Sequence, residues 1–198
     1  LYYLKLAEEV EPKLFGVEQQ SWFEVLDREY ENLQAALHWS VERGELEIAL
    51  RLGGALWRFW LVRGYVSGEL LWLEQAIQGI KEVKASVRAK ALISAGALAY
   101  HRGDIVRAKL YCRESLALFQ DLGEMQGVAY SLHRLGLIAS QSSDYGAAQS
   151  LEEEALQLFK EAGDKAGIAY SLTDLAYVAM DQGEFVRARL LAEEGLAL

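Results

Sequence analysis

The sequence repeats itself with a period of forty residues, and this repeat limits the folds open to the chain more than any other feature. Residues 127–132 read GVAYSL, and residues 167–172 read GIAYSL. The same offset aligns glycine or serine at 103, 143 and 183, alanine at 108, 148 and 188, and glutamate at 114, 154 and 194. A fixed period of about 20–50 residues indicates structural units that each bury an apolar face against their neighbours.

Each copy has the pattern of two helices joined by a tight turn. In the middle copy Val128, Leu132 and Leu135 recur at the four- and three-residue steps of one helical face. Gly103 and Gly183, each followed by an acidic residue, predict the end of one helix and the start of the next. We therefore expect an all-α fold, and within it an α-α superhelix of antiparallel helical hairpins.

The copies divide the chain into an N-terminal segment and an array. We expect residues 1–44 to form helices that pack on the array, and residues 45–198 to form hairpins over 45–84, 85–124, 125–164 and 165–198, the first divergent and the last truncated. The divergent copy matches at an offset of 39, and its pattern predicts helices over about 45–63 and 66–80.

Two features predict how these helices pack. Gly96 and Gly136 lie in the middle of expected helices, where glycine costs about 1 kcal/mol relative to alanine. Close approach of a neighbouring helix would offset that cost, so we expect it at both positions. All five tryptophans precede residue 73, which predicts a bulkier core at that end of the chain.

The composition argues against several classes of function. The formal net charge is −9 and neither half of the chain is basic, so we expect no direct contact with nucleic acid, which depends on lysine and arginine facing phosphates. No uncharged apolar stretch approaches the roughly 18 residues of a membrane span. The lone Cys112 cannot form an internal disulfide, which is consistent with a reducing compartment, and we expect a cytoplasmic protein.

The sequence contains no recognisable catalytic or metal-binding pattern. Its three histidines, His38, His101 and His133, are not spaced from one another or from Cys112 as zinc ligands are. The acidic triplet at 152–154 spans part of one helical turn, and we interpret it as a solvated helix face. We expect no catalytic, cofactor or metal site and no enzymatic activity, with an all-helical enzyme that lacks a local motif as the alternative.

Small residues at fixed places in the two helices of each copy resemble the tetratricopeptide repeat, in its longer form of about forty residues. The residues that carry this resemblance are Leu135, Gly136, Ala139, Ala148, Ala155 and Leu156 in the middle copy and Leu175, Ala176, Ala179, Ala188, Gly195 and Leu196 in the last. Two features depart from it. Ala99, Ala139 and Ala179 replace the usual aromatic residue, and Glu152 stands where a buried apolar side chain is common.

A second resemblance covers the upstream half. The run LDREYENLQAALHWSVERGELEIALRLGGALWRFWLVRG, with WLEQAI after it, resembles the segment that follows the nucleotide-binding and winged-helix modules in bacterial STAND-class signalling ATPases, including AfsR-like and LuxR-type transcriptional regulators. The residues that carry it are Glu29, Asn32, Leu33, Ala36, Leu37, Trp39, Ala49, Leu50, Leu52, Phe59, Trp60, Gly64, Trp72 and Leu73.

This resemblance implies that the helical array is the sensor or partner-binding arm, while the ATPase and DNA-binding parts lie elsewhere. The sequence has no GxxxxGK[ST] loop, so no ATP site is transferred to it and no cofactor is expected. From the residues alone the same run is a helical stripe that ends at Gly44, with Asn32 as a helix cap or a polar buttress.

The tetratricopeptide resemblance also implies a concave wall lined by the first helix of each hairpin. Counting from the small core residues, the predicted groove consists of Lys90, Ile93, Ala97, Tyr100, Tyr130, His133, Arg134, Leu137, Tyr170, Thr173, Asp174 and Tyr177. This mixture suits a protein or peptide, because tyrosine and arginine are frequent energetic anchors. Alternatively, Tyr130 and Tyr170 only cover the next hairpin, and the variable positions form an idle solvent face.

Together these patterns predict a non-catalytic scaffold that binds a protein, a peptide or a small ligand in its groove. The resemblances imply that it is the sensor or partner-binding arm of a larger cytoplasmic signalling ATPase or transcriptional regulator. Two alternatives are a free-standing tetratricopeptide adaptor and a helical-repeat nucleic-acid-binding module, which would need lysine and arginine clustered along the inner wall.

Overall fold

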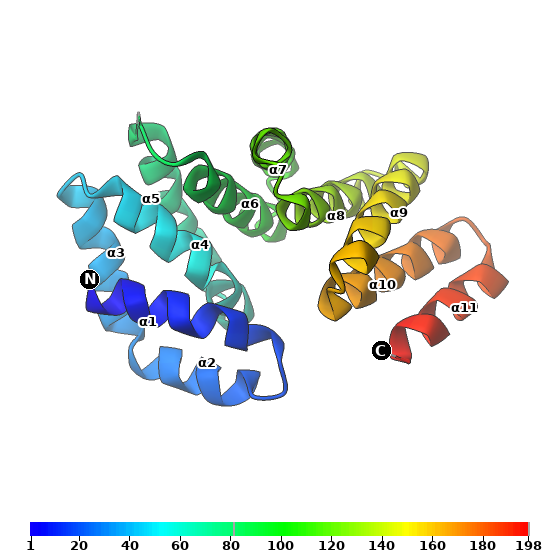
Figure 1. The fold of residues 1–198 in the computed structure, drawn as a ribbon, viewed down its shortest axis with the longest axis horizontal. Helices are drawn as coiled ribbons and strands as arrows, with labels where there is room; N and C mark the ends of the chain where they lie inside the picture. Colours follow the sequence, from blue (N-terminus) through cyan, green and yellow to red (C-terminus); the bar gives the residue numbers. More distant parts are fainter. Residues whose placement is uncertain (81, 198) are drawn as a thin grey trace. The chain divides into compact units, whose positions relative to one another are not determined.

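The computed structural model describes residues 1–80 and 82–197, and it confirms the all-α fold. The described residues form eleven α-helices and one short 3-10 helix, with no strand among them. They make two compact units, Leu1–Tyr111 and Cys112–Leu198, which divide within helix α7 (Ile105–Leu122) (Figure 1). The boundary predicted at residue 44 falls inside the first unit.

The first unit is built around helix α4, which contacts α1, α3, α5 and α6. Its elements before α7 are α1 (Tyr2–Val10), η1 (Glu11–Phe15), α2 (Gln19–Arg28), α3 (Tyr30–Glu42), α4 (Leu46–Arg63), α5 (Val66–Gly79) and α6 (Ala85–His101). The helices predicted over 45–63 and 66–80 are therefore confirmed within one residue. Phe59 and Trp60 of α4 are fully buried, whereas the other four tryptophans are partly or well exposed. The bulk of this core comes from Phe59, Trp60 and leucines, so the tryptophan prediction holds only for Trp60.

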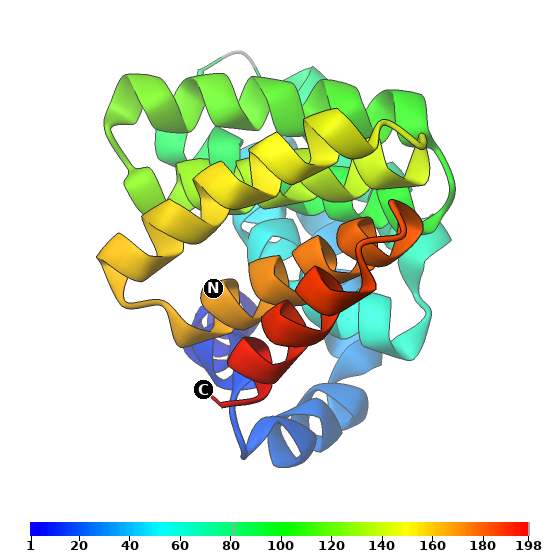
Figure 2. The same cartoon turned by 90° about the vertical axis from the view of Figure 1, so that its right-hand side faces the viewer.

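The second unit continues from the end of α7 through four helices that pack in chain order. They are α8 (Met125–Gln141), α9 (Tyr145–Ala162), α10 (Lys165–Asp181) and α11 (Phe185–Leu196). Helix α8 packs on α9, α9 on α10 and α10 on α11. Figures 1 and 2 both show α10 and α11 side by side. Helix α10 also contacts α8, so it covers both helices of the hairpin before it.

The turns between helices use the left-handed backbone conformation that favours glycine. Gly103 and Gly183 have φ of 83° and 79°, as the predicted helix ends require. Ser143 stands at the same position of the middle copy and also has a positive φ, 60°. It is the one described residue other than glycine in this region of backbone space.

The repeated phrase is explained by a glycine that lies against a phenylalanine ring. A Cβ on Gly127 would lie 2.4 Å from the ring of Phe119, and a Cβ on Gly167 would lie 2.2 Å from the ring of Phe159. Both distances are far below van der Waals contact, so only glycine lets the helices meet this closely. The two copies therefore repeat one packing contact as well as one sequence.

Acidic residues cap several helices. Asp144 accepts a hydrogen bond from Ala147 N at 3.1 Å, and Asp164 accepts one from Gly167 N at 3.0 Å. Asn32 does not cap a helix: α3 begins at Tyr30, and the exposed Asn32 amide donates to Glu29 Oε2 at 2.9 Å. Among residues 1–80 and 82–197, no helix combines the length and the apolar character that crossing a bilayer requires.

Candidate functional site

The twelve residues predicted to line one groove are divided between the two compact units. Lys90, Ile93, Ala97 and Tyr100 belong to the first unit, where Lys90 forms an ion pair with Glu11. Ala97 is fully buried, so its assignment to an open wall is wrong. The alanine lies within the packed helices of its own unit and cannot reach a partner.

In the second unit three helices bring together a buried polar group, the His133 cluster, defined as His133, Glu152 and Asp174. His133 Nδ1 lies 3.1 Å from Glu152 Oε1 and 3.3 Å from Asp174 Oδ2. One ligand atom from each residue lies within 4.8 Å of the others. The three residues come from α8, α9 and α10, so the cluster forms only where α10 covers the preceding hairpin.

Glu152 reaches this position because Gly136 leaves room for it. A Cβ on Gly136 would lie 2.5 Å from Glu152 Oε1. The prediction that Gly136 permits a close helix approach is thus confirmed, and the group that fills the space is a carboxylate. The side chain of Glu152 is 1% exposed, while that of Asp174 is 21% exposed and gives the cluster its contact with solvent.

Burial controls the protonation of the cluster. It lowers the pKa of His133 to about 4, assisted by the Arg134 guanidinium and opposed by Asp174. Burial raises the pKa of Glu152 to about 8 and that of Asp174 to about 6. His133 is therefore neutral at pH 7, and both carboxyl groups keep their protons to a higher pH than carboxyl groups usually do, Glu152 more so than Asp174.

Two further side chains enclose the cluster. The ring of Tyr170 stacks on the His133 imidazole, with centroids 5.9 Å apart and planes 16° apart. Arg134 faces all three residues, and burial lowers the pKa of its guanidinium, which nevertheless stays charged. His133, Arg134, Tyr170 and Asp174 were all predicted to line an open groove. The structure gathers them around a buried carboxylate: His133 is itself buried, whereas Arg134, Tyr170 and Asp174 are partly exposed.

Two predictions are therefore wrong for the second unit. Glu152 does not belong to a solvated face, and His133 is buried and does not line an open wall. The repeat pattern, in which Glu152 stands where a buried apolar side chain is common, is the better guide here: Glu152 aligns with Cys112 in the first copy and Ala192 in the last. Cys112 is fully buried, and this burial raises the pKa of its thiol to about 12. The position is thus buried in the first two copies, and it carries an acid in the middle copy alone.

The first unit also buries two glutamates, Glu69 and Glu74, and their hydrogen-bond partners differ from those of Glu152. Glu69 accepts hydrogen bonds from Tyr30 and Gln34, each at 2.9 Å. Glu74 accepts from Tyr111 and Arg107, at 3.0 and 3.1 Å. Glu152 instead lies beside an imidazole and a second carboxyl group, and the Arg134 guanidinium supplies the positive charge near it.

The contacts of Tyr130 support the alternative interpretation, in which this side chain covers the adjoining hairpin and does not line a groove. Its hydroxyl donates to Asp164 Oδ2 at 2.8 Å, and its ring lies edge-on to Phe159. The hydroxyl thus contacts the residue that caps α10. Leu137 of the same helix is partly buried.

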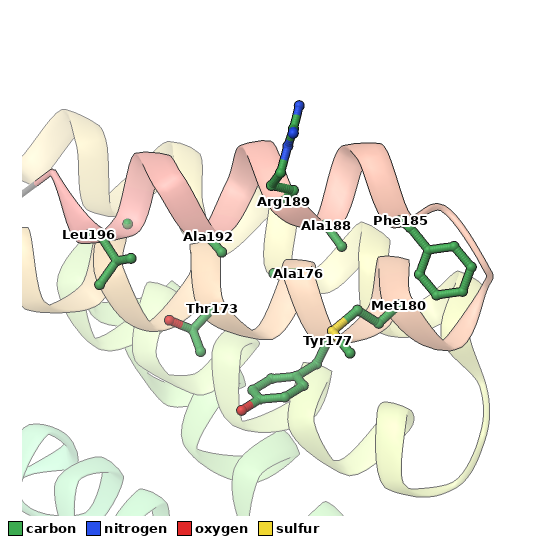
Figure 3. Close-up of a pocket in the computed structure, with 10 residues that line it drawn as sticks. Thr173, Ala176, Tyr177, Met180, Phe185, Ala188, Arg189, Ala192 and Leu196 are labelled. Carbon is green, nitrogen blue, oxygen red and sulfur yellow. The ribbon is translucent and has the colours of Figure 1, made fainter.

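The open surface of the second unit is a groove between α10 and α11, with a volume of about 550 Å³. Figure 3 shows Tyr177 and Met180 of α10 along one side and Phe185 and Leu196 of α11 along the other. Tyr177 is 61% exposed and Phe185 is 70% exposed. We call this surface the α10–α11 groove, which is lined by Thr173, Ala176, Tyr177, Met180, Phe185, Ala188, Arg189, Ala192, Gly195 and Leu196.

Two of the twelve predicted residues, Thr173 and Tyr177, line the α10–α11 groove. The residues that α11 contributes were missed, because the prediction assigned the groove to the first helix of each hairpin. The groove offers apolar contact and brings together no pair of groups suited to acid–base or nucleophilic chemistry.

The helix pairs, their tight turns and their internal repeat define an all-α chain of repeated helical units. No protein-family model matches the sequence, and no curated protein matches it. Among solved structures, the chain is similar to the crystal structure of BtubC (BKLC) from P. vanneervenii, with a TM-score of 0.70 and 18% sequence identity. The alignment covers 99% of this chain and 87% of BtubC. At this identity the likeness shows the fold alone.

Proposed function

We propose that the chain is a non-catalytic scaffold for protein or peptide binding, built as a tetratricopeptide-like superhelix of antiparallel hairpins. The observation that carries the proposal is the α10–α11 groove, which presents large apolar side chains from two neighbouring helices. Exposed apolar surface of this kind marks interaction sites when it is contiguous. Tyrosine, phenylalanine and methionine are also side chains that interfaces favour.

We further propose that the occupant is an amphipathic α-helix of a partner protein. The repeat supplies the argument, because residues 136–156 correspond to 176–196 at the forty-residue offset. In the middle copy the face that includes Gly136, Ala148 and Glu152 is covered by helix α10. The equivalent face of the last copy, with Ala176, Ala188 and Ala192, lines the open groove. A helix is therefore the element that this surface is shaped to receive.

The resemblance of residues 26–64 to STAND-class regulators gives this scaffold its cellular setting in our proposal. The chain would act as the sensor or partner-binding arm of a larger cytoplasmic signalling ATPase or transcriptional regulator, whose ATPase and DNA-binding domains lie on other segments. Trp39, one of the residues that carry this resemblance, is 51% exposed on α3. It is available for contact in a way that the buried Leu33 and Leu37 are not.

The test uses helical peptides selected for binding to the chain. A display library of amphipathic helix-forming sequences supplies the probes, and their dissociation constants are measured with the purified chain and with a Tyr177→Ala/Phe185→Ala variant. We expect the double variant to lose at least about tenfold in affinity, because one anchor residue typically contributes more than about 1 kcal/mol. Val106→Ala is the matched control, since Val106 is an exposed apolar residue on α7 in the other unit.

Two results would overturn the proposal. Selected peptides that bind the double variant as tightly as the original chain would place the binding surface elsewhere. Concentration-dependent dimerisation that the same variant abolishes, measured by light scattering, would show that the groove receives a second copy of the chain.

A further inference from the structure

We propose that the His133 cluster is a binding site for a divalent first-row transition-metal ion, held by His133 Nδ1, Glu152 and Asp174 between helices α8, α9 and α10. The proposal goes beyond the scaffold function and does not depend on it. It begins from the distances among the donor atoms. Metal–ligand bonds to imidazole nitrogen and carboxylate oxygen are about 2.0–2.2 Å long, so neighbouring ligands of one ion lie roughly 3–3.5 Å apart. The separations of 3.1 and 3.3 Å from Nδ1 to the two carboxylates fall in this range.

The surroundings of the cluster have the form of a metal site. His133 and Glu152 are almost entirely buried, and the partial exposure of Asp174 provides an entry path from solvent. Gly136 leaves the space that the Glu152 carboxylate occupies. The stacked ring of Tyr170 orients the imidazole. Three protein ligands with one solvent-facing side leave coordination positions for water.

A second observation, on the hydroxyl of Ser171 beside Glu152, points to a ligand at this place. The hydroxyl of Ser171 is fully buried and has no partner in hydrogen-bond geometry, although it lies close enough to Glu152 to lower the pKa of that carboxyl. The equivalent serine of the previous copy, Ser131, donates to Gly127 O at 2.8 Å and lies 3.3 Å from the hydroxyl of Ser115. Buried polar atoms without partners are rare in proteins. A metal-bound water beside Glu152 would give the Ser171 hydroxyl a partner in good hydrogen-bond geometry.

The donors select the class of ion. One imidazole and two carboxylates suit zinc, manganese, iron or cobalt, whereas magnesium and calcium prefer oxygen ligands alone. Arg134 faces the same cluster and adds one positive charge. With both carboxylates ionised the group carries a net charge of about −1, which still attracts a dication but limits its affinity.

The test is titration of the chelator-treated full chain with Co²⁺, followed by its visible absorption, and with Zn²⁺, followed by calorimetry. We expect one ion per chain. His133→Gln and Asp174→Asn should each weaken metal binding by at least about 100-fold. Loss of a residue that only hydrogen-bonds to a metal ligand typically lowers metal affinity about 10–100-fold, and loss of a ligand itself should lower the affinity at least as much. Glu153→Gln and His101→Gln are the matched controls, an acid on the same helix and an exposed histidine in the other unit, and both should bind as the original chain does.

Absence of saturable binding would overturn the proposal, and so would equal binding by the original chain and the two ligand variants. Circular dichroism establishes that each variant is folded. If a variant does not fold, the original chain still gives an answer through paramagnetic broadening by Mn²⁺ of its amide resonances. Broadening centred on Gly136 and Ser171 supports the site, and broadening confined to exposed acidic residues refutes it.

Discussion

Tyr130 on α8 donates a hydrogen bond of 2.8 Å to Asp164, the residue that caps helix α10. The same carboxylate accepts hydrogen bonds from the Gln126 amide at 3.0 Å and from Gly167 N at 3.0 Å. One side chain therefore joins the first helix of one hairpin to the start of the next. The contact fixes where α10 begins, and α10 supplies a residue both to the His133 cluster and to the α10–α11 groove.

Tyr130→Phe should lower the free energy of unfolding by about 1–2 kcal/mol, because a partly buried carboxylate loses one of its donors while the ring contact with Phe159 remains. Urea denaturation of the purified chain measures the change. Tyr177→Phe is the control, since that tyrosine is exposed, and it should change stability by less than about 0.5 kcal/mol. Equal effects of the two variants would mean that the bond to Asp164 contributes nothing.

Asp164 should make stability depend on pH in the acid range. Burial raises its pKa, but the hydrogen bonds from Gly167, Gln126 and Tyr130 outweigh burial and hold the pKa below its usual value. A depressed pKa in the folded state means a contribution that is fully present above the unfolded value of about 3.9 and is lost as pH falls through the folded value.

Asp164→Asn keeps a capping side chain and removes the titrating group. The variant should therefore lose less stability than the original chain as the pH falls below about 4. Urea unfolding measured at several pH values tests this expectation, with Asp121→Asn on α7 as the control. If the free energy of unfolding falls equally steeply below about pH 4 in Asp164→Asn and in the original chain, the role of Asp164 is refuted.

Ser143→Gly should stabilise the chain. Ser143 has a φ of 60°, and a side chain in the left-handed region costs about 1–2 kcal/mol. Glycine removes that cost but loses about 0.5–1 kcal/mol through the greater freedom of the unfolded chain. We expect a net gain of up to about 1 kcal/mol and a higher melting temperature. Ser142→Gly, next to it at a φ of −85°, should instead lower the melting temperature, and a gain there would contradict the explanation.

The sequence was sufficient for features that depend on neighbouring residues. Gly103 and Gly183 end their helices as predicted, because a positive φ is a local requirement that glycine meets. The helices of the divergent copy were predicted within one residue from its match to the next copy at an offset of 39. Close packing at Gly136 also followed from a local cost, since a glycine inside a helix needs a compensating contact.

The candidate site could not be predicted in the same way. His133 and Glu152 are both polar, and each is buried because α10 covers both helices of the hairpin before it. Helical spacing says which residues share a face, but it does not say which face a later helix will cover. The α10–α11 groove was missed for the same reason, because it exposes on α11 a surface whose equivalent on α9 is covered.

Gly136→Ala tests whether the fold reserves space for the Glu152 carboxylate. The new Cβ would lie 2.5 Å from Glu152 Oε1 and 2.9 Å from Cγ, so the variant should lose about 1–3 kcal/mol through overpacking. Gly146→Ala is the matched control, because a Cβ at Gly146 on α9 has no neighbour within 4 Å. This variant should gain up to about 1 kcal/mol from higher helix propensity.

A double-mutant cycle separates the steric clash between the Cβ at position 136 and the Glu152 carboxylate from other effects of alanine at position 136. In a Glu152→Ala background the carboxylate is absent, so Gly136→Ala should cost much less than it does in the original chain. Chemical denaturation of the four proteins supplies the coupling energy. A cost that is the same in both backgrounds would show that Gly136 is needed for a reason other than Glu152, and the close contact between α8 and α9 would then need another explanation.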